Sequence, residues 1–200
     1  MKKWFCFLAL LMLGGCNDRE MVDTFDNDDS YQFYISKSGI YEDDANSNFL
    51  LLFDKGLVMD NRVDYLVLLE DMDIDIDYKD KYILRDKLVL DGVEIYIDNM
   101  IGISFDNYLF CVYGDEWYYK DDFGKCDFIY ILNGEDDVDI SFSDRVKVLF
   151  YNEYSEFKTS FLEKMFASWL DTYIVSSDSV ISLVISDDGY EVNTLEIEKE

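Results

Sequence analysis

Short runs of β-branched and aromatic residues dominate the chain from residue 31 onward. Turn-forming stretches such as Asp91-Gly92 separate many of these runs, as is typical of β-strands. Because the spacings between runs are short, the pattern favours antiparallel hairpins over parallel crossovers. The expected strands lie near residues 31–36, 49–53, 63–69, 87–90, 93–98, 100–105, 108–113, 127–132, 146–151, 180–186 and 190–197.

One segment near the C-terminus breaks this rhythm. Between residues 155 and 173 the apolar residues recur at steps of three and four, which is typical of an amphipathic helix. We expect them to pack against a sheet as core rather than to form a ligand-binding box. They are Phe157, Phe161, Leu162, Met165, Phe166, Trp169 and Leu170. The predicted fold class is therefore α+β, mostly antiparallel β-sheet with one principal amphipathic helix near 155–173.

Charged and apolar residues alternate strictly from Glu70 to Asp80. Successive side chains of a strand point to opposite faces, so four carboxylates are expected on one face and four apolar side chains on the other. The carboxylates are Asp71, Asp73, Asp75 and Asp77, and the apolar residues are Met72, Ile74, Ile76 and Tyr78. The acidic face is either a solvated strand face or a docking face for a cationic partner.

A calcium loop is the other use for such carboxylates. Asp73, Asp75 and Asp77 have the first three ligand spacings of an EF-hand loop, which requires Gly at its sixth position and Glu at its twelfth. This chain has Tyr78 and Leu84 there. An alternating pattern also favours an extended strand over a loop that curls around an ion. We expect no metal site.

The N-terminus has the anatomy of a signal peptide. Lys2 and Lys3 precede an apolar run from Trp4 to Leu13, which is too short to cross a hydrocarbon core of about 30 Å. The sequence that follows, LGGC at residues 13–16, resembles the lipobox of bacterial lipoproteins. The resemblance implies cleavage before Cys16 and lipidation of that residue. The alternative is an ordinary cysteine that follows a buried or spanning helix.

The lipobox resemblance also implies an address and a division of the chain. In the enterobacterial sorting pattern an Asp after the cysteine retains a lipoprotein in the inner membrane, and Asn17 here favours the outer membrane, facing the periplasm. Residues 1–15 are then a signal peptide. Residues 16–30 read as a lipidated acidic tether and residues 31–200 as a single globular domain.

Composition restricts the classes of partner. The chain has 17 Lys and Arg residues against 44 Asp and Glu residues, a net charge of −27. This charge argues against binding nucleic acid and favours cationic partners. Half of the residues are hydrophobic and 17% are aromatic, which is ample material for a core and argues against disorder.

The cysteines predict one disulfide. Cys6 leaves with the signal peptide and Cys16 takes lipid, so Cys111 and Cys126 remain as a natural pair in an oxidising compartment. Two separate buried thiols are the alternative.

The segment between these two cysteines is the second expected partner-binding site. Carboxylates there flank three aromatic residues that are typical interface anchors, unless the aromatics pack inward as part of a hairpin. The residues are Asp115, Glu116, Trp117, Tyr118, Tyr119, Asp121 and Asp122.

Catalytic signatures are missing from the sequence. The chain contains no histidine, which excludes His-based triads and most catalytic zinc sites. Ser155 and Lys158 form an S-x-x-K, but no S-D-N or K-T-G accompanies it. We therefore expect a protein that is not an enzyme and has no cofactor.

These features together favour a lipid-anchored, periplasm-facing acidic protein that captures a basic protein. In general character the chain resembles the small acidic lipoproteins that protect bacteria against toxins delivered to the envelope, the immunity type. The resemblance implies a toxin or effector as the partner, in addition to the membrane reached through the lipid anchor. The alternative is a structural or surface envelope lipoprotein without a toxin partner.

Overall fold

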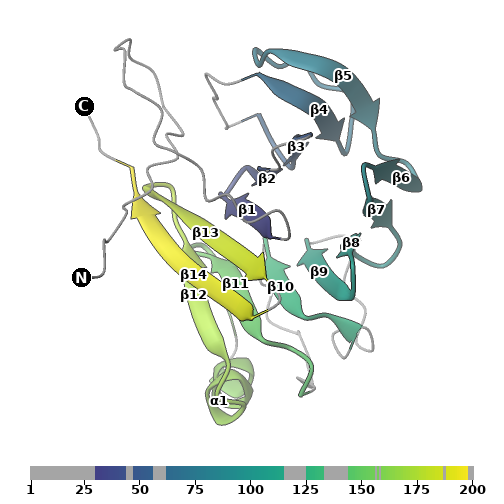
Figure 1. Ribbon diagram of the computed structural model, residues 1–200. Helices are drawn as coiled ribbons and strands as arrows, with labels where there is room; N and C mark the ends of the chain where they lie inside the picture. The colour runs from purple at the N-terminus through teal and green to yellow at the C-terminus, as the bar shows by residue number, and fades with distance from the viewer. Residues whose placement is uncertain are drawn as a thin grey trace, which may run out of the picture. The chain divides into compact units, whose positions relative to one another are not determined.

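The computed structural model describes residues 30–43, 47–55, 62–114, 125–132, 144–155, 157, 159–186 and 188–197. The chain divides into two compact units, one made of Met1–Tyr82 with Asp178–Glu200 and the other of Ile83–Ser177. Each unit is built on one seven-stranded sheet (Figure 1). The expected boundaries at residues 15 and 30 fall on or next to residues outside the described part.

Sheet A belongs to the first unit and has the strand order β14-β13-β1-β2-β3-β4-β5. The pairs from β14 to β3 are antiparallel, and β3 pairs with β4 in parallel. Strand β1 lies between β2 and β13. Most of the chain separates β13 from β1 in the sequence. The strands are β1 (Tyr31–Ile35), β2 (Gly39–Glu42), β3 (Phe49–Leu52), β4 (Val63–Leu68), β5 (Tyr78–Ile83), β13 (Ser179–Ser186) and β14 (Gly189–Glu196).

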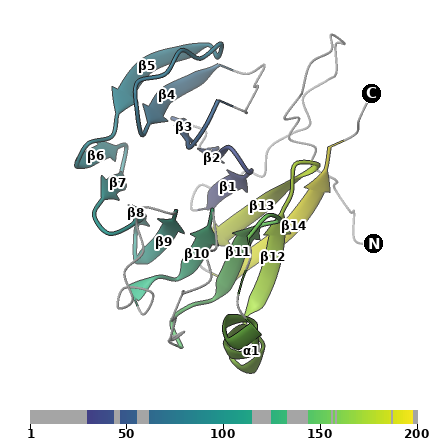
Figure 2. The ribbon, with the colours of Figure 1, turned by 180° about the vertical axis from the view of Figure 1, so that it is seen from behind.

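Sheet B belongs to the second unit and has the order β12-β11-β10-β9-β8-β7-β6. Strands β6 to β9 form an antiparallel meander, whereas β9 to β12 are parallel neighbours (Figure 2). The strands are β6 (Lys87–Leu90), β7 (Val93–Ile97), β8 (Ile101–Phe105), β9 (Tyr108–Tyr113), β10 (Phe128–Ile131), β11 (Val148–Asn152) and β12 (Asp171–Val175).

Turn chemistry explains the meander. Asp91 and Gly92 join β6 to β7, and both have positive φ, 39° and 97°. A two-residue hairpin loop of this kind matches the twist of its strands and favours Asp-Gly. Asp106, with φ 46°, opens the turn between β8 and β9. The hairpins expected from the Asp-Gly signal and the short spacing are therefore present in this half of sheet B.

The prediction of an α+β fold is wrong. The described residues are nearly all β, with one short helix, and both sheets are mixed: sheet A contains the parallel pair β3–β4, and β9 to β12 of sheet B are parallel. Parallel neighbours need crossover connections of about a dozen residues or more. The chain has room for them between β9, β10, β11 and β12, where residues 114–127, 132–147 and 153–170 intervene. The prediction considered the short spacing of most strand-like segments and did not take account of these three longer connections.

The expected principal helix is a single short one within the described residues. Helix α1 runs over Thr159–Ala167, inside the crossover from β11 to β12. Its Phe161 and Met165 are buried against the disulfide side of sheet B, as expected for core. Phe166 and Trp169, however, are exposed, so their prediction as core residues is wrong.

The core of sheet B has a different character on each face. One face carries a row of aromatic rings: Phe110 lies 5.9 Å from Phe150 and 6.3 Å from Phe128, and Phe150 lies 5.9 Å from Tyr173. The other face holds a mixed cluster under α1, in which the disulfide packs with aliphatic side chains such as Leu149 and with Tyr113 and Phe161. No helix in the described part of the chain is long and apolar enough to span a membrane.

Candidate functional site

The acidic alternation lies on the connection between β4 and β5. Residues 71–77 lie between these strands in no regular secondary structure. Met72 and Ile76 are buried in one cluster with Leu50 and Leu66, and Ile74 packs partly against it. The segment therefore rests its apolar side on residues of β3 and β4 rather than adding a strand to the sheet.

The carboxylates of this segment point outward. Asp71, Asp73, Asp75 and Asp77 are exposed, and we name them the acidic row. The expected alternation of exposed acids and buried apolar residues is thus observed. Tyr78, which we expected on the apolar side, is instead 37% exposed. It begins β5, a strand at the edge of the sheet whose residues are mostly exposed.

Hydrogen bonds hold both ends of the acidic row. The backbone N–H of Val63 donates to the carbonyl of Asp77 at 2.9 Å. At the other end, Lys81 Nζ donates to Asp71 Oδ1 at 2.9 Å and to the carbonyl oxygen of Met72 at 3.2 Å. The hydrogen bond to Asp71 raises the pKa of Lys81. The extended conformation of the row is therefore fixed from both ends and from beneath.

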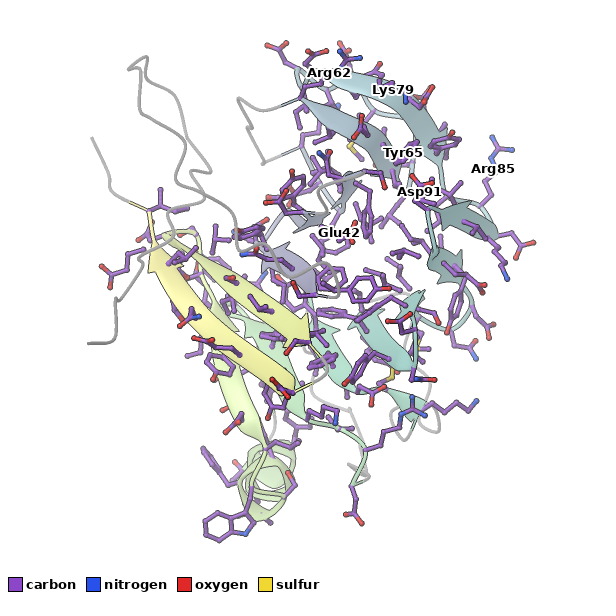
Figure 3. All side chains as sticks on the ribbon, in the orientation of Figure 1. Glu42, Arg62, Tyr65, Lys79, Arg85 and Asp91 are labelled. Carbon is purple, nitrogen blue, oxygen red and sulfur yellow. A yellow bond between two sulfur atoms is a disulfide. The ribbon has the colours of Figure 1, made fainter. Side chains whose placement is uncertain are left out.

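The middle of the row is free to attract a cation. Asp73, Asp75 and Asp77 form no salt bridge with any described residue. Two exposed basic residues belong to the neighbouring strands, Arg62 just before β4 and Lys79 on β5 (Figure 3). Both basic residues lie near the Asp77 end of the row, because Lys79 follows Asp77 by two residues and Arg62 precedes Val63, which bonds to Asp77. We therefore expect the strongest attraction for cationic side chains at Asp73 and Asp75.

The spacing of the row suits side chains rather than a metal ion. Alternate residues of an extended chain stand roughly 7 Å apart, whereas calcium needs several oxygens within about 2.6 Å of one point. No group of three metal-binding side chains occurs among the described residues. The row can instead meet successive Lys or Arg side chains of an extended or helical partner segment.

The second expected site and the expected lipidation site fall on other parts of the chain. Its acidic and aromatic residues, Asp115, Glu116, Trp117, Tyr118, Tyr119, Asp121 and Asp122, lie outside the described residues. Cys16, the expected lipidation site, also lies outside them. Both the second acidic cluster and the lipidation of Cys16 therefore stay predictions.

Cys111 and Cys126 form a disulfide with an S–S distance of 2.02 Å. Both residues are fully buried. The Tyr113 hydroxyl lies 3.5 Å from Cys126 Sγ and donates to Met100 Sδ at 3.1 Å. The bond joins β9 to the residue two positions before β10 and closes the segment that carries the second acidic cluster.

Sequence reasoning missed the exposed aromatic side chains beside α1. Trp169 is 93% exposed and Phe166 is 71% exposed. A signal was available: the apolar residues between 155 and 173 are too many for the single stripe, somewhat over 100° wide, that one buried helix face requires. Part of that set therefore had to remain outside the core.

Comparison with known proteins yields no family. No family model matches the chain, and no curated protein matches it. Among solved structures, the chain is similar to a protein from Thermotoga maritima described as a zinc-dependent hydrolase of the metallo-beta-lactamase superfamily. The identity is 11%, the TM-score is 0.41, and the match covers 70% of this chain and 82% of that one.

This neighbour bears on one expectation. It is described as a hydrolase, which stands against our expectation that the chain is not an enzyme, and we withdraw that expectation. At this TM-score and identity the likeness does not assign an activity, a substrate or a zinc site to the chain.

Proposed function

We propose that this protein is a lipid-anchored, periplasm-facing acidic binding protein that captures a cationic protein, of the inhibitor or immunity type. The observation that carries the proposal is the acidic row, which presents its carboxylates outward on a segment whose opposite side is buried.

The row is prepared for binding before a partner arrives. Met72 and Ile76 fix the segment from beneath, and the hydrogen bond from Val63 to Asp77 fixes one end. Binding then does not have to order the backbone, which removes a cost that flexible acidic tails bear. A rigid row of carboxylates also favours partners whose basic groups have matching spacing.

Long-range attraction supports the same partner class. The net charge of −27 attracts positively charged proteins and repels anionic ones. Charge of this kind mainly accelerates association and selects among partners, and salt screens it beyond about 8 Å at physiological ionic strength.

The anchor and its location rest on the N-terminal residues. Lys2, Lys3, the short apolar run and the LGGC box support lipidation at Cys16. Asn17 after the cysteine supports the outer membrane. More than one acyl chain on Cys16 gives stable anchoring, where a single chain is marginal.

The experiment starts with a pull-down from envelope extract, followed by measurement of association and dissociation rates for the captured protein. The test variant is Asp73→Asn/Asp75→Asn. Its matched control is Asp86→Asn/Asp98→Asn, which removes two exposed carboxylates from the second unit and changes the net charge equally. We expect the test variant to associate at least several-fold more slowly at low salt, and the control to lose much less.

Two results would contradict the proposal. If the test variant and the control associate equally fast at low salt, the row is only a solvated surface. If no soluble cationic protein is captured under any salt condition, the chain is better explained as a structural or surface envelope lipoprotein.

A further inference from the structure

Three large apolar side chains of the second unit are exposed at the C-terminal end of α1, just after it, and on the following strand β12. Trp169 is 93% exposed, Phe166 71% and Ile174 52%. We name these three residues the aromatic corner. Large exposed apolar side chains that gather in one place mark interaction sites more often than scattered ones do.

Topology places the three residues on one side of sheet B. Helix α1 lies in the crossover from β11 to β12 and buries Phe161 in the cluster that contains Leu149. Ile174 is paired in register with Tyr151, whose ring packs against Phe157 at 5.4 Å, just before the helix. Ile174 therefore lies on the helix side of the sheet, at the edge that β12 forms.

The backbone at Trp169 is unusual. Its φ of 56° is the left-handed conformation that commonly ends a helix, where Gly or Asn is the usual residue. The N–H of Trp169 bonds to the Phe166 carbonyl at 3.4 Å, and the Ser168 hydroxyl donates to the Met165 carbonyl at 2.7 Å. A bulky residue is thus held in a disfavoured conformation while its side chain gains almost no burial. Such a departure from local preference points to function.

Charge distinguishes the possible occupants of the corner. Exposed Glu163 lies three residues before Phe166 on the same helix, so the two side chains are neighbours on its surface. Exposed Asp171 follows Trp169 by two residues. A second copy of the chain would carry the same net charge of −27 and be repelled, and so would an anionic bilayer. A cationic protein segment is favoured.

We propose that the aromatic corner is a docking surface for a partner segment in which Arg or Lys alternates with apolar residues. The guanidinium or ammonium group stacks on Trp169, attracted by the negative charge of the chain, and the apolar side chains cover Phe166 and Ile174. The proposal rests on the proposed function for the positive charge of the partner, and it concerns a contact surface within the second unit alone.

The test uses the full chain purified from membranes in nonionic detergent and two fluorescently labelled synthetic peptides. One peptide alternates Arg with Leu and the other alternates Arg with Ser, so their charges are equal. The test variant is Trp169→Gly, because Gly suits the left-handed backbone and the fold should not suffer. The control is Val89→Ser, which removes a 60% exposed apolar side chain from β6 of the same unit.

We expect Trp169→Gly to weaken binding of the Arg-Leu peptide by about tenfold or more, as for a buried aromatic anchor. Binding of the Arg-Ser peptide should weaken less, and Val89→Ser should leave both affinities within about twofold of the wild type. The thermal midpoint of each variant is measured alongside. If Trp169→Gly unfolds, Phe166→Ser takes its place and should show the same difference between the peptides.

Three outcomes would overturn the aromatic corner. The first is unchanged affinity for the Arg-Leu peptide in a folded Trp169→Gly variant. The second is self-association of the wild type in sedimentation that Trp169→Gly abolishes, which would assign the corner to a second copy. The third is quenching of Trp169 fluorescence by brominated phospholipid in reconstituted vesicles, measured as the difference between the wild type and Trp169→Gly. Such quenching would assign the aromatic corner to the bilayer.

These outcomes are separate from failure of the proposed function. The peptides do not involve the natural partner, and Asp73→Asn/Asp75→Asn alters only the first unit. If Trp169→Gly binds the Arg-Leu peptide normally while the Asp variant loses association rate with the captured protein, the corner fails and the proposed function stands. If instead Trp169→Gly loses affinity for the Arg-Leu peptide while Asp73→Asn/Asp75→Asn associates normally with the captured protein, the role of the acidic row fails and the aromatic corner stands.

Discussion

Arg145 donates from both Nε and Nη2 to a single oxygen, Oδ2, of the buried Asp127, at 3.1 and 2.9 Å. The same oxygen accepts the backbone N–H of Leu109 at 3.0 Å. Arg145 Nη2 also donates to the carbonyl of Asn107 at 3.2 Å. Asp127 and Arg145 together therefore tie the residues before β10 and β11 to β9 and to the turn before β9, in the part of sheet B where the pairing changes from antiparallel to parallel.

Replacing Asp127 with Ala should destabilise the protein. The substitution leaves the Leu109 N–H and the Arg145 guanidinium without their acceptor, and breaking a pair at a buried carboxylate costs about 2–4 kcal/mol. Urea unfolding of Asp127→Ala measures this loss in the free energy of unfolding. Asp144→Ala, which removes the exposed carboxylate next to Arg145, should stay within about 0.5 kcal/mol of the wild type. Equal stability of the two variants would contradict the role of Asp127.

Removing the disulfide should also lower stability. A bridge over a separation of 15 residues stabilises by about 3 kcal/mol in the chain-entropy model. Cys111→Ala/Cys126→Ala should lose roughly this amount in urea unfolding. Intact mass after alkylation of the denatured, unreduced protein checks the bond itself. Two alkylated cysteines at positions 111 and 126 without reductant would show that the bond does not form in the cell.

Strongly alkaline pH should destabilise sheet A. Burial, together with the Asp43 charge, raises the pKa of Tyr34 to about 12, and burial raises the pKa of Tyr41 as well. The unfolded chain releases these protons near its ordinary pKa of about 10, so the stabilisation is intact below that pH. It is lost as the pH rises from about 10 toward the folded pKa, at about 1.4 kcal/mol per pH unit for each group.

The measurement combines urea unfolding with the ultraviolet absorbance of tyrosinate over this pH range. Tyr34→Phe should reduce the alkaline loss of stability, because one of the groups with a raised pKa is gone. Tyr154→Phe, which changes an exposed tyrosine of the second unit, should leave the loss unchanged. A Tyr34→Phe variant that loses stability with pH as steeply as the wild type would disprove the assignment.

Cys16 should be the site of acylation. The short apolar run and the LGGC box predict cleavage before this residue. Cells that grow with radiolabelled palmitate should label the wild type in the membrane fraction, and Cys16→Ala should remain unlabelled. Cys6→Ala, which alters the signal peptide alone, is the matched control. Equal labelling of wild type and Cys16→Ala would rule the anchor out.

The sequence by itself determined the features that depend on a few neighbouring residues. Asp91-Gly92 predicted a hairpin because only certain residues adopt positive φ easily, and the hairpin is there. The alternation around Asp73 predicted outward carboxylates over buried Met72 and Ile76 because side chains of an extended chain point to opposite sides. Both outcomes follow from backbone geometry over one or two residues.

Only the tertiary structure decided the arrangement of these elements. Strand β1 pairs with β13, and β9 to β12 run in parallel, because burial of apolar faces selects among distant segments that local patterns treat as equivalent. Tertiary packing also decided which apolar residues near the helix belong to the core. Phe161 and Met165 fill the space beneath α1, while the helix ends before Trp169 and leaves that side chain exposed. A helical pattern gives the period of apolar residues, but the area available on the facing sheet sets how many of them can be buried.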